Sequence, residues 1–183
     1  MNRIDMSKYH DPFTLKSRIK RVIWSITYIL FFRFFFLNMF RTWRNFILRL
    51  FGAKIGNNSL VYASVKIWAP WNLEMGSFSA IGRNVDIYNQ GLVCIGSNTI
   101  ISQKSYICAS SHYHTTPSLE WYAAPIYIKN QVWVCADAFI GPGVIIEDGA
   151  VVGARSAVFK KVDSWTVVGG NPAKFIKIRE IKS

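Results

Sequence analysis

Residues 75–112 read MGSFSAIGRNVDIYNQGLVCIGSNTIISQKSYICASSH, and an aliphatic residue recurs in this stretch every six positions, with one two-residue insertion. The same spacing extends in both directions, from residue 55 to residue 163. Fourteen of the fifteen positions that follow it are Ile or Val: Ile55, Val61, Ile67, Met75, Ile81, Ile87, Ile95, Ile101, Ile107, Ile128, Val134, Ile140, Ile146, Val152 and Val158. Helices and hairpin strands have periods of 3.6 and 2 residues. A period of six therefore indicates a solenoid of stacked repeats.

A second column of residues supports a three-sided coil. Four residues after each aliphatic position lies a small or β-branched residue, with Trp71 as the one exception. Such residues suit tight corners between short strands. Residues 55–72, 75–92 and 95–112 each hold three hexapeptides, and residues 128–163 hold six more. The sequence therefore predicts five triangular coils, which make a prism about 24 Å tall at the spacing of β-strands.

The repeat stops at residues 112–127, HYHTTPSLEWYAAPIY. A long loop that leaves a regular solenoid is typical of a functional site. His112 and His114 open this loop, and the chain has one other histidine, His10. Histidine is the side chain best suited to act as a base near neutral pH. We therefore expect the chemistry of this chain at the loop.

Residues 1–54 hold eleven of the 22 basic residues and two of the ten acidic residues, so the net charge of +12 is concentrated in this third of the chain. Within it, residues 22–40 form an apolar run broken only by Arg33, long enough for a helix of roughly 28 Å. The sequence predicts a basic, aromatic helical segment here. Basic residues on both sides favour a helix that lies on an anionic membrane surface. Packing on the prism or on another subunit, and a membrane-crossing helix, are the alternatives.

The charge pattern does not indicate that the chain binds nucleic acid, because the basic residues frame an apolar segment and not a polar face with stacking aromatics.

The three cysteines, Cys94, Cys108 and Cys135, are scattered and lack the spacing of a metal or disulfide framework, which favours a reducing compartment. The N-terminus lacks the pattern of a secretory signal peptide. We therefore expect a cytoplasmic protein, at the cytoplasmic face of the inner membrane if the N-terminal segment contacts lipid.

Several motifs carry a family resemblance: GAKIG at 52–56, ISQKSYICASSH at 101–112, GARSAVFK at 153–160 and GNPAKFI at 170–176. With the repeat, these motifs resemble the hexapeptide-repeat acyltransferases, and within them the colanic acid biosynthesis acetyltransferases, over about residues 20–180. The resemblance implies an all-β solenoid, a left-handed parallel β-helix over residues 55–168, with a tail at 169–183. It also implies a homotrimer with active sites between subunits, acetyl-CoA as the donor and no metal.

The resemblance also implies roles for individual residues. His112 matches the position of the catalytic histidine, and it would act as the general base in direct transfer to a sugar hydroxyl of an exopolysaccharide or another surface glycan. The acceptor would be a sugar, an oligosaccharide or a lipid-linked saccharide. Acceptor-binding residues would be Asn84, Asn89 and His114, although asparagine is also common at solenoid corners. Tyr113 departs from the pattern, which has aspartate there. Residues that would bind acetyl-CoA are Trp133, Ala136, Ala154, Lys160, Lys174 and Lys177.

Other functions compete with this hypothesis. The chain could acetylate an amino sugar at nitrogen, or a small molecule. It could also be a non-catalytic β-helix scaffold. A hydratase of the carbonic anhydrase type would need three histidine ligands for its catalytic zinc, and His10 lies far from the other two histidines in the sequence.

Overall fold

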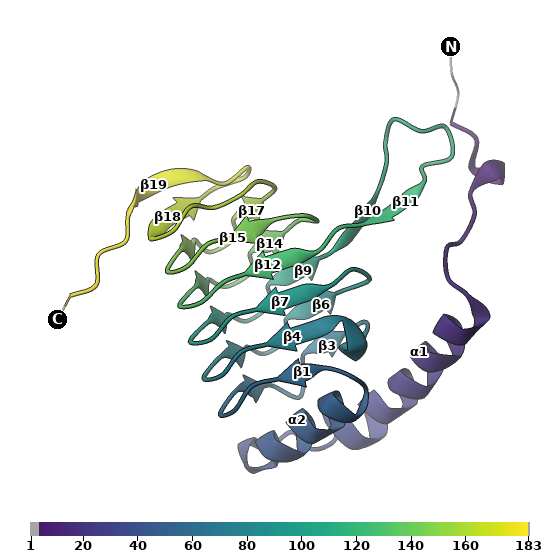
Figure 1. Ribbon diagram of the computed structural model, residues 1–183, viewed down its shortest axis with the longest axis horizontal. Coiled ribbons are helices and arrows are strands. Elements are labelled where there is room, and N and C mark those ends of the chain that lie inside the picture. Colours follow the sequence, from purple (N-terminus) through teal and green to yellow (C-terminus); the bar gives the residue numbers. More distant parts are fainter. Residues whose placement is uncertain (1–3, 183) are drawn as a thin grey trace.

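The computed structural model describes residues 4–182, and it shows a prism of stacked coils with two helices at its base (Figure 1). Three sheets form the sides of the prism, and their strands are parallel except for β19 in the second sheet. The first contains β1 (Lys54–Ile55), β4 (Leu73–Met75), β7 (Val93–Ile95), β12 (Ile126–Ile128) and β15 (Ile145–Ile146). The second contains β2 (Leu60–Val61), β5 (Ala80–Ile81), β8 (Ile100–Ile101), β13 (Trp133–Val134), β16 (Val151–Val152), β18 (Thr166–Gly169) and β19 (Lys174–Ile178). The third contains β3 (Lys66–Ile67), β6 (Asp86–Tyr88), β9 (Tyr106–Cys108), β14 (Phe139–Ile140) and β17 (Ala157–Val158).

The aliphatic column forms the core of the prism. All fifteen of its side chains are buried, with exposed fractions of 7% or less. Members of successive coils stand in register, so that Ile81 pairs with Ile101, and Ile101 pairs with Val134. The solenoid prediction is therefore confirmed.

The predicted number of coils was slightly too small, because the solenoid has about six turns. Val162 bridges to Ile146, and β18 then pairs with β16. Val162 and Val168 are again six residues apart, but they are out of phase with the column that ends at Val158. The strand β19 folds back antiparallel onto β18, so part of the predicted tail belongs to the sheet.

The small second column stabilises the stacking of the coils. Ser59, Ser79 and Thr99 are buried, and their hydroxyls donate hydrogen bonds of 2.6–2.7 Å to carbonyl oxygens of the next coil. Each hydroxyl also accepts a hydrogen bond from a backbone N–H of that coil. Since a buried hydroxyl needs partners, these residues form a continuous ladder along one edge of the prism.

Gly96 lies where two coils approach closely. A Cβ atom on Gly96 would lie 2.5 Å from the carbonyl carbon of Lys129 and 2.7 Å from the backbone nitrogen of Asn130. We expect Gly96→Ala to lower the free energy of unfolding by about 1–3 kcal/mol, since the backbones must separate. Denaturant unfolding measures this, with Gly153→Ala as the control because its nearest contact would be the Val168 carbonyl oxygen at 3.2 Å. Equal losses in the two variants would contradict this explanation.

The N-terminal segment is helical, as the sequence predicts, and its apolar run is divided among several helices. Its helices are η1 (Met6–Lys8), α1 (Leu15–Thr27), η2 (Tyr28–Arg33, a π-helix), η3 (Asn38–Phe40) and α2 (Arg41–Leu50), and a further short helix, η4 (Pro70–Asn72), lies between β3 and β4. The chain turns at residues 34–37, where the guanidinium of Arg44 donates to the carbonyl oxygens of Phe35 and Leu37. Within residues 4–182, the helices are too short or too polar to cross a membrane.

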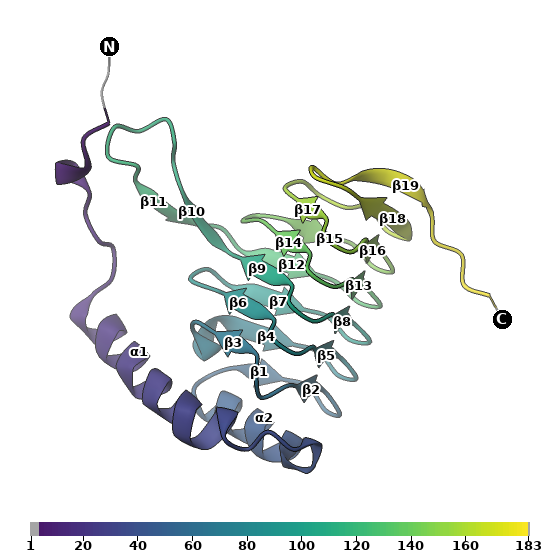
Figure 2. The same cartoon turned by 180° about the vertical axis from the view of Figure 1, so that it is seen from behind.

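One side of these helices packs on the first coil, as one of the alternatives expected. Trp24 is 3% exposed, and its indole N–H donates to the carbonyl oxygen of Ile67 at 2.7 Å. From α2, Asn45 donates to the carbonyl oxygen of Ser59 at 2.8 Å. The helices thereby cover the open end of the aliphatic core (Figures 1 and 2). The opposite side of the helices is exposed.

Candidate active site

His112 ends β10 (Ser110–His112), which pairs with β11 (Trp121–Ala123) in a hairpin that leaves the prism after the third coil (Figure 1). The ring atom Nδ1 of His112 lies 2.6 Å from the carbonyl oxygen of Leu119. Because a carbonyl oxygen only accepts hydrogen bonds, Nδ1 carries the proton. Nε2 is then left with the lone pair of a base. The loop itself thus sets the tautomer of its histidine.

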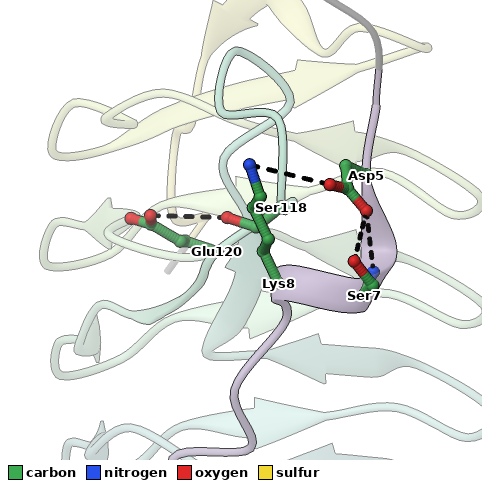
Figure 3. A network of polar contacts seen from close by, with 5 residues as sticks. All are labelled: Asp5, Ser7, Lys8, Ser118 and Glu120. Atoms are coloured by element: carbon green, nitrogen blue, oxygen red, sulfur yellow. Dashed lines mark hydrogen bonds and ion pairs between the residues drawn. The ribbon is translucent and has the colours of Figure 1, made fainter.

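The N-terminal segment lies against this loop, although about a hundred residues separate the two in the sequence. The backbone N–H of Asp5 donates to the carbonyl oxygen of Pro117 at 2.8 Å. The ring of Tyr9 lies 5.8 Å from that of His112, centroid to centroid. Figure 3 shows the polar contacts within each of the two segments: Asp5 with Ser7 and Lys8, and Ser118 with Glu120.

A pocket of about 480 Å³ opens at His112. Five of the ten lining residues are aromatic, namely Tyr9, Phe13, Tyr88, Tyr106 and Trp121, and the other five are polar, namely Asp11, Gln90, Ser110, Ser111 and His112. The indole N–H of Trp121 donates to Gln90 at 2.7 Å, and Phe13 packs edge-on against Trp121. An aromatic wall with fixed polar groups is the usual design of a site for a small organic ligand.

Two tyrosines in this pocket keep their protons at neutral pH. Burial raises the pKa of Tyr88 and of Tyr106, and the nearby thiol of Cys108 raises both further. Their hydroxyls are therefore neutral and can both donate and accept hydrogen bonds. The sequence did not single out these tyrosines, nor Tyr9, Asp11, Phe13, Gln90 or Trp121, because nothing in the repeat marks them.

The predicted acceptor residues have different surroundings. Asn89 is fully buried, and its side-chain amide exchanges two hydrogen bonds with the backbone of Ala69, which is a structural role. Asn84 is exposed at a corner with a φ of 58°, a conformation that asparagine tolerates. His114 is exposed beyond the hairpin. None of these three residues is among the described residues that line the pocket of His112.

The predicted donor residues lie on the upper coils, away from this pocket. Trp133 and Lys177 line a groove of about 640 Å³. Lys160 and Lys174 line another, of about 350 Å³. The remaining two lie on neighbouring turns: Ala136 is half-buried, and Ala154 is exposed beside Arg155, whose N–H donates to the carbonyl oxygen of Ala136. None of the six lines the pocket of His112 within residues 4–182.

The cysteines are half-buried and free. Burial raises the pKa of the Cys94 thiol and of the Cys135 thiol, which keeps both protonated and unreactive at neutral pH. The thiol of Cys108 donates to the carbonyl oxygen of Ser110 at 3.2 Å. Each cysteine therefore has the environment of a small filler.

Comparisons with known proteins found related sequences and solved structures of the same fold. No family model matches the chain. A protein of Escherichia coli K12 named "Putative colanic acid biosynthesis acetyltransferase WcaF" is 48% identical over 137 residues, which is 75% of each chain. The galactoside O-acetyltransferase of the same organism is 30% identical over 128 residues, 68% of this chain and 63% of that protein.

A solved structure shows the same fold. It is a hexapeptide-repeat acetyltransferase of Vibrio cholerae in complex with acetyl-CoA, 21% identical, with a TM-score of 0.82 over 93% of each chain. The extent of identity to the Escherichia coli protein, the periodic core and the shared fold show that the chain belongs to the hexapeptide-repeat acetyltransferases.

Proposed function

We propose that this chain transfers an acetyl group from acetyl-CoA to a sugar hydroxyl in the synthesis of an exopolysaccharide, with His112 as the general base. The 2.6 Å contact between Nδ1 of His112 and the Leu119 carbonyl oxygen, at a pocket with aromatic walls, is the observation that carries the proposal. Relatives named for acetyl transfer in colanic acid synthesis and to galactosides support the substrate class. The acetyl-CoA complex of the Vibrio cholerae protein supports the donor.

In the proposed mechanism, the acceptor hydroxyl gives its proton to Nε2 of His112 as its oxygen attacks the thioester carbonyl carbon. The carbonyl oxygen of Leu119 stabilises the imidazolium that results, because it accepts from Nδ1. The C–S bond then breaks, and the proton passes from Nε2 to the departing thiolate. The backbone N–H of Ala136, which makes no hydrogen bond within residues 4–182, is our candidate to stabilise the developing oxyanion.

We further propose that the site is completed in a homotrimer. Within one chain the pocket of His112 contains none of the six residues expected to bind the donor. A neighbouring prism can supply them if each site lies between two subunits. Light scattering should then give three times the 20.9 kDa mass of the chain. In this proposal the protein is cytoplasmic, because it uses acetyl-CoA.

The test is to incubate the purified protein with acetyl-CoA and a panel of sugar nucleotides, oligosaccharides and lipid-linked saccharides, and to identify acetylated product by mass spectrometry. Trp121→Ala should raise the KM for the acceptor about fivefold, since it removes one aromatic wall of the pocket, and should leave the KM for acetyl-CoA unchanged. The matched control is Tyr122→Ala, because Tyr122 is next in β11 but stacks on Tyr113 and does not line the pocket. Absence of product with every acceptor would refute the proposal.

A further inference from the structure

The exposed side of α1 carries an apolar stripe. Leu15, Ile19, Val22, Ile23 and Ile26 are each more than half exposed. At 100° per residue these five side chains fall within an arc of roughly 100°. Trp24, which packs on the prism, points to the opposite side. The apolar stripe therefore points away from the prism, on which the other side of the helix packs through Trp24.

The stripe continues into the neighbouring elements. The indole N–H of Trp43, on α2, donates to the carbonyl oxygen of Phe31, on η2, at 2.8 Å. The ring of Trp43 lies 5.6 Å from that of Phe35 and 5.9 Å from that of Phe46, centroid to centroid. Three strongly exposed apolar side chains lie at and just after the turn: Phe34 at 76%, Phe36 at 70% and Met39 at 77%. We call this surface, from α1 through the turn to α2, the apolar helical face.

Positive charge surrounds this face. Between Asp11 and Glu74 the sequence has ten basic residues and no acidic residue. Lys16 lies on one edge of the α1 stripe, and Arg18 lies on the other edge, where it forms an ion pair with Asp11 at 2.8 Å. Arg33 and Arg41 are exposed, and neither forms an ion pair with any residue in 4–182.

We propose that the apolar helical face binds the surface of an anionic lipid bilayer, with α1 lying in the plane of the interface. An amphipathic helix with basic edges and exposed aromatic and aliphatic side chains has the composition that interfacial binding requires. Anionic headgroups complement the positive border. The same face on a second copy of the chain would bring like charges together, which argues against self-association through it.

This contact places the candidate active site close to the membrane. The segment that precedes α1 runs from the helix to the β10–β11 hairpin in both views of the molecule (Figures 1 and 2). Phe13 and Tyr9, from that segment, line the pocket of His112. A lipid-linked saccharide could thus reach the pocket while its lipid stays in the bilayer. This consequence rests on the proposed function, whereas the binding of lipid itself does not.

Flotation of the full-length protein with vesicles tests the proposal. We expect binding to phosphatidylcholine vesicles that contain about one third phosphatidylglycerol, and weaker binding to phosphatidylcholine alone. Ile26→Glu should lower the partition coefficient about tenfold or more, since it removes one inserted side chain. Arg33→Gln should weaken binding to the anionic vesicles about fivefold.

The matched control is Phe78→Glu, because Phe78 is 62% exposed on the prism, against 55% for Ile26. This variant should bind vesicles like the wild type. The proposal is wrong if the wild type binds neither kind of vesicle, or if Ile26→Glu binds as well as Phe78→Glu does. It is also wrong if Ile26→Glu lowers the mass in solution, which would make this face a subunit interface. None of these results depends on acetyltransferase activity, so a failure here leaves the proposed function intact.

Discussion

His112→Ala is expected to lower kcat for acetyl transfer by about 10²–10⁴, the usual contribution of a positioned general base. Without the imidazole, the attacking hydroxyl must lose its proton to water. The side chain is exposed, and its one polar contact within residues 4–182 is the hydrogen bond to Leu119. We therefore expect the variant to fold, and its KM for acetyl-CoA to stay close to that of the wild type. Product formation measured by mass spectrometry and thermal unfolding together test both expectations.

His10→Ala is the matched control. His10 is an exposed histidine of the N-terminal segment, and it does not line the pocket. Its replacement should leave kcat unchanged. If His112→Ala were as active as His10→Ala, the family assignment would stand, but His112 would no longer be the base. A shared loss in both variants would indicate that the N-terminal segment had moved from the loop.

Arg44→Met should destabilise the fold by about 3 kcal/mol, because a buried carbonyl group without a donor costs about 1–3 kcal/mol, and the variant leaves one buried and two part-buried carbonyl groups without theirs. The side chain of Arg44 is fully buried beneath α2. Its guanidinium donates to the carbonyl oxygens of Val61, Phe35 and Leu37 at 2.7–2.9 Å. Burial lowers the pKa of Arg44 from its usual value, although the group stays charged at neutral pH. Methionine has a similar stem but leaves all three carbonyl oxygens without this donor.

Denaturant unfolding measures the effect, with Arg41→Met as the control. Arg41 is the exposed first residue of the same helix, so its replacement should change the free energy of unfolding by about 0.5 kcal/mol or less. Similar values for the two variants would show that Arg44 does not hold the turn at residues 34–37. A loss confined to Arg44→Met would confirm that Arg44 holds the turn at residues 34–37 against the first coil, beside the contacts of Trp24 and Asn45.

The sequence alone determined the periodic part of the protein. Ile81, Ile101 and Val134 stack because each side of a coil buries one side chain. This local requirement repeats along the chain, so the spacing of aliphatic residues in the sequence reveals it. The place of His112 at the start of the loop was predictable for the same reason, since the repeat stops there, while its role as the base stays a prediction. The family followed from short motifs, and the comparisons confirmed it.

Only the tertiary structure decided what surrounds His112 and where the N-terminal third lies. Tyr9 and Phe13 reach the pocket across about a hundred residues, and no periodicity in the sequence marks such a contact. In the sequence, nothing distinguishes Arg44 from the other basic residues beside the apolar run. In the structure it is buried, and its guanidinium donates to three carbonyl oxygens. A local pattern predicts which face of an element is apolar. It does not predict which distant surface covers that face, because this depends on how the folded chain brings remote segments together.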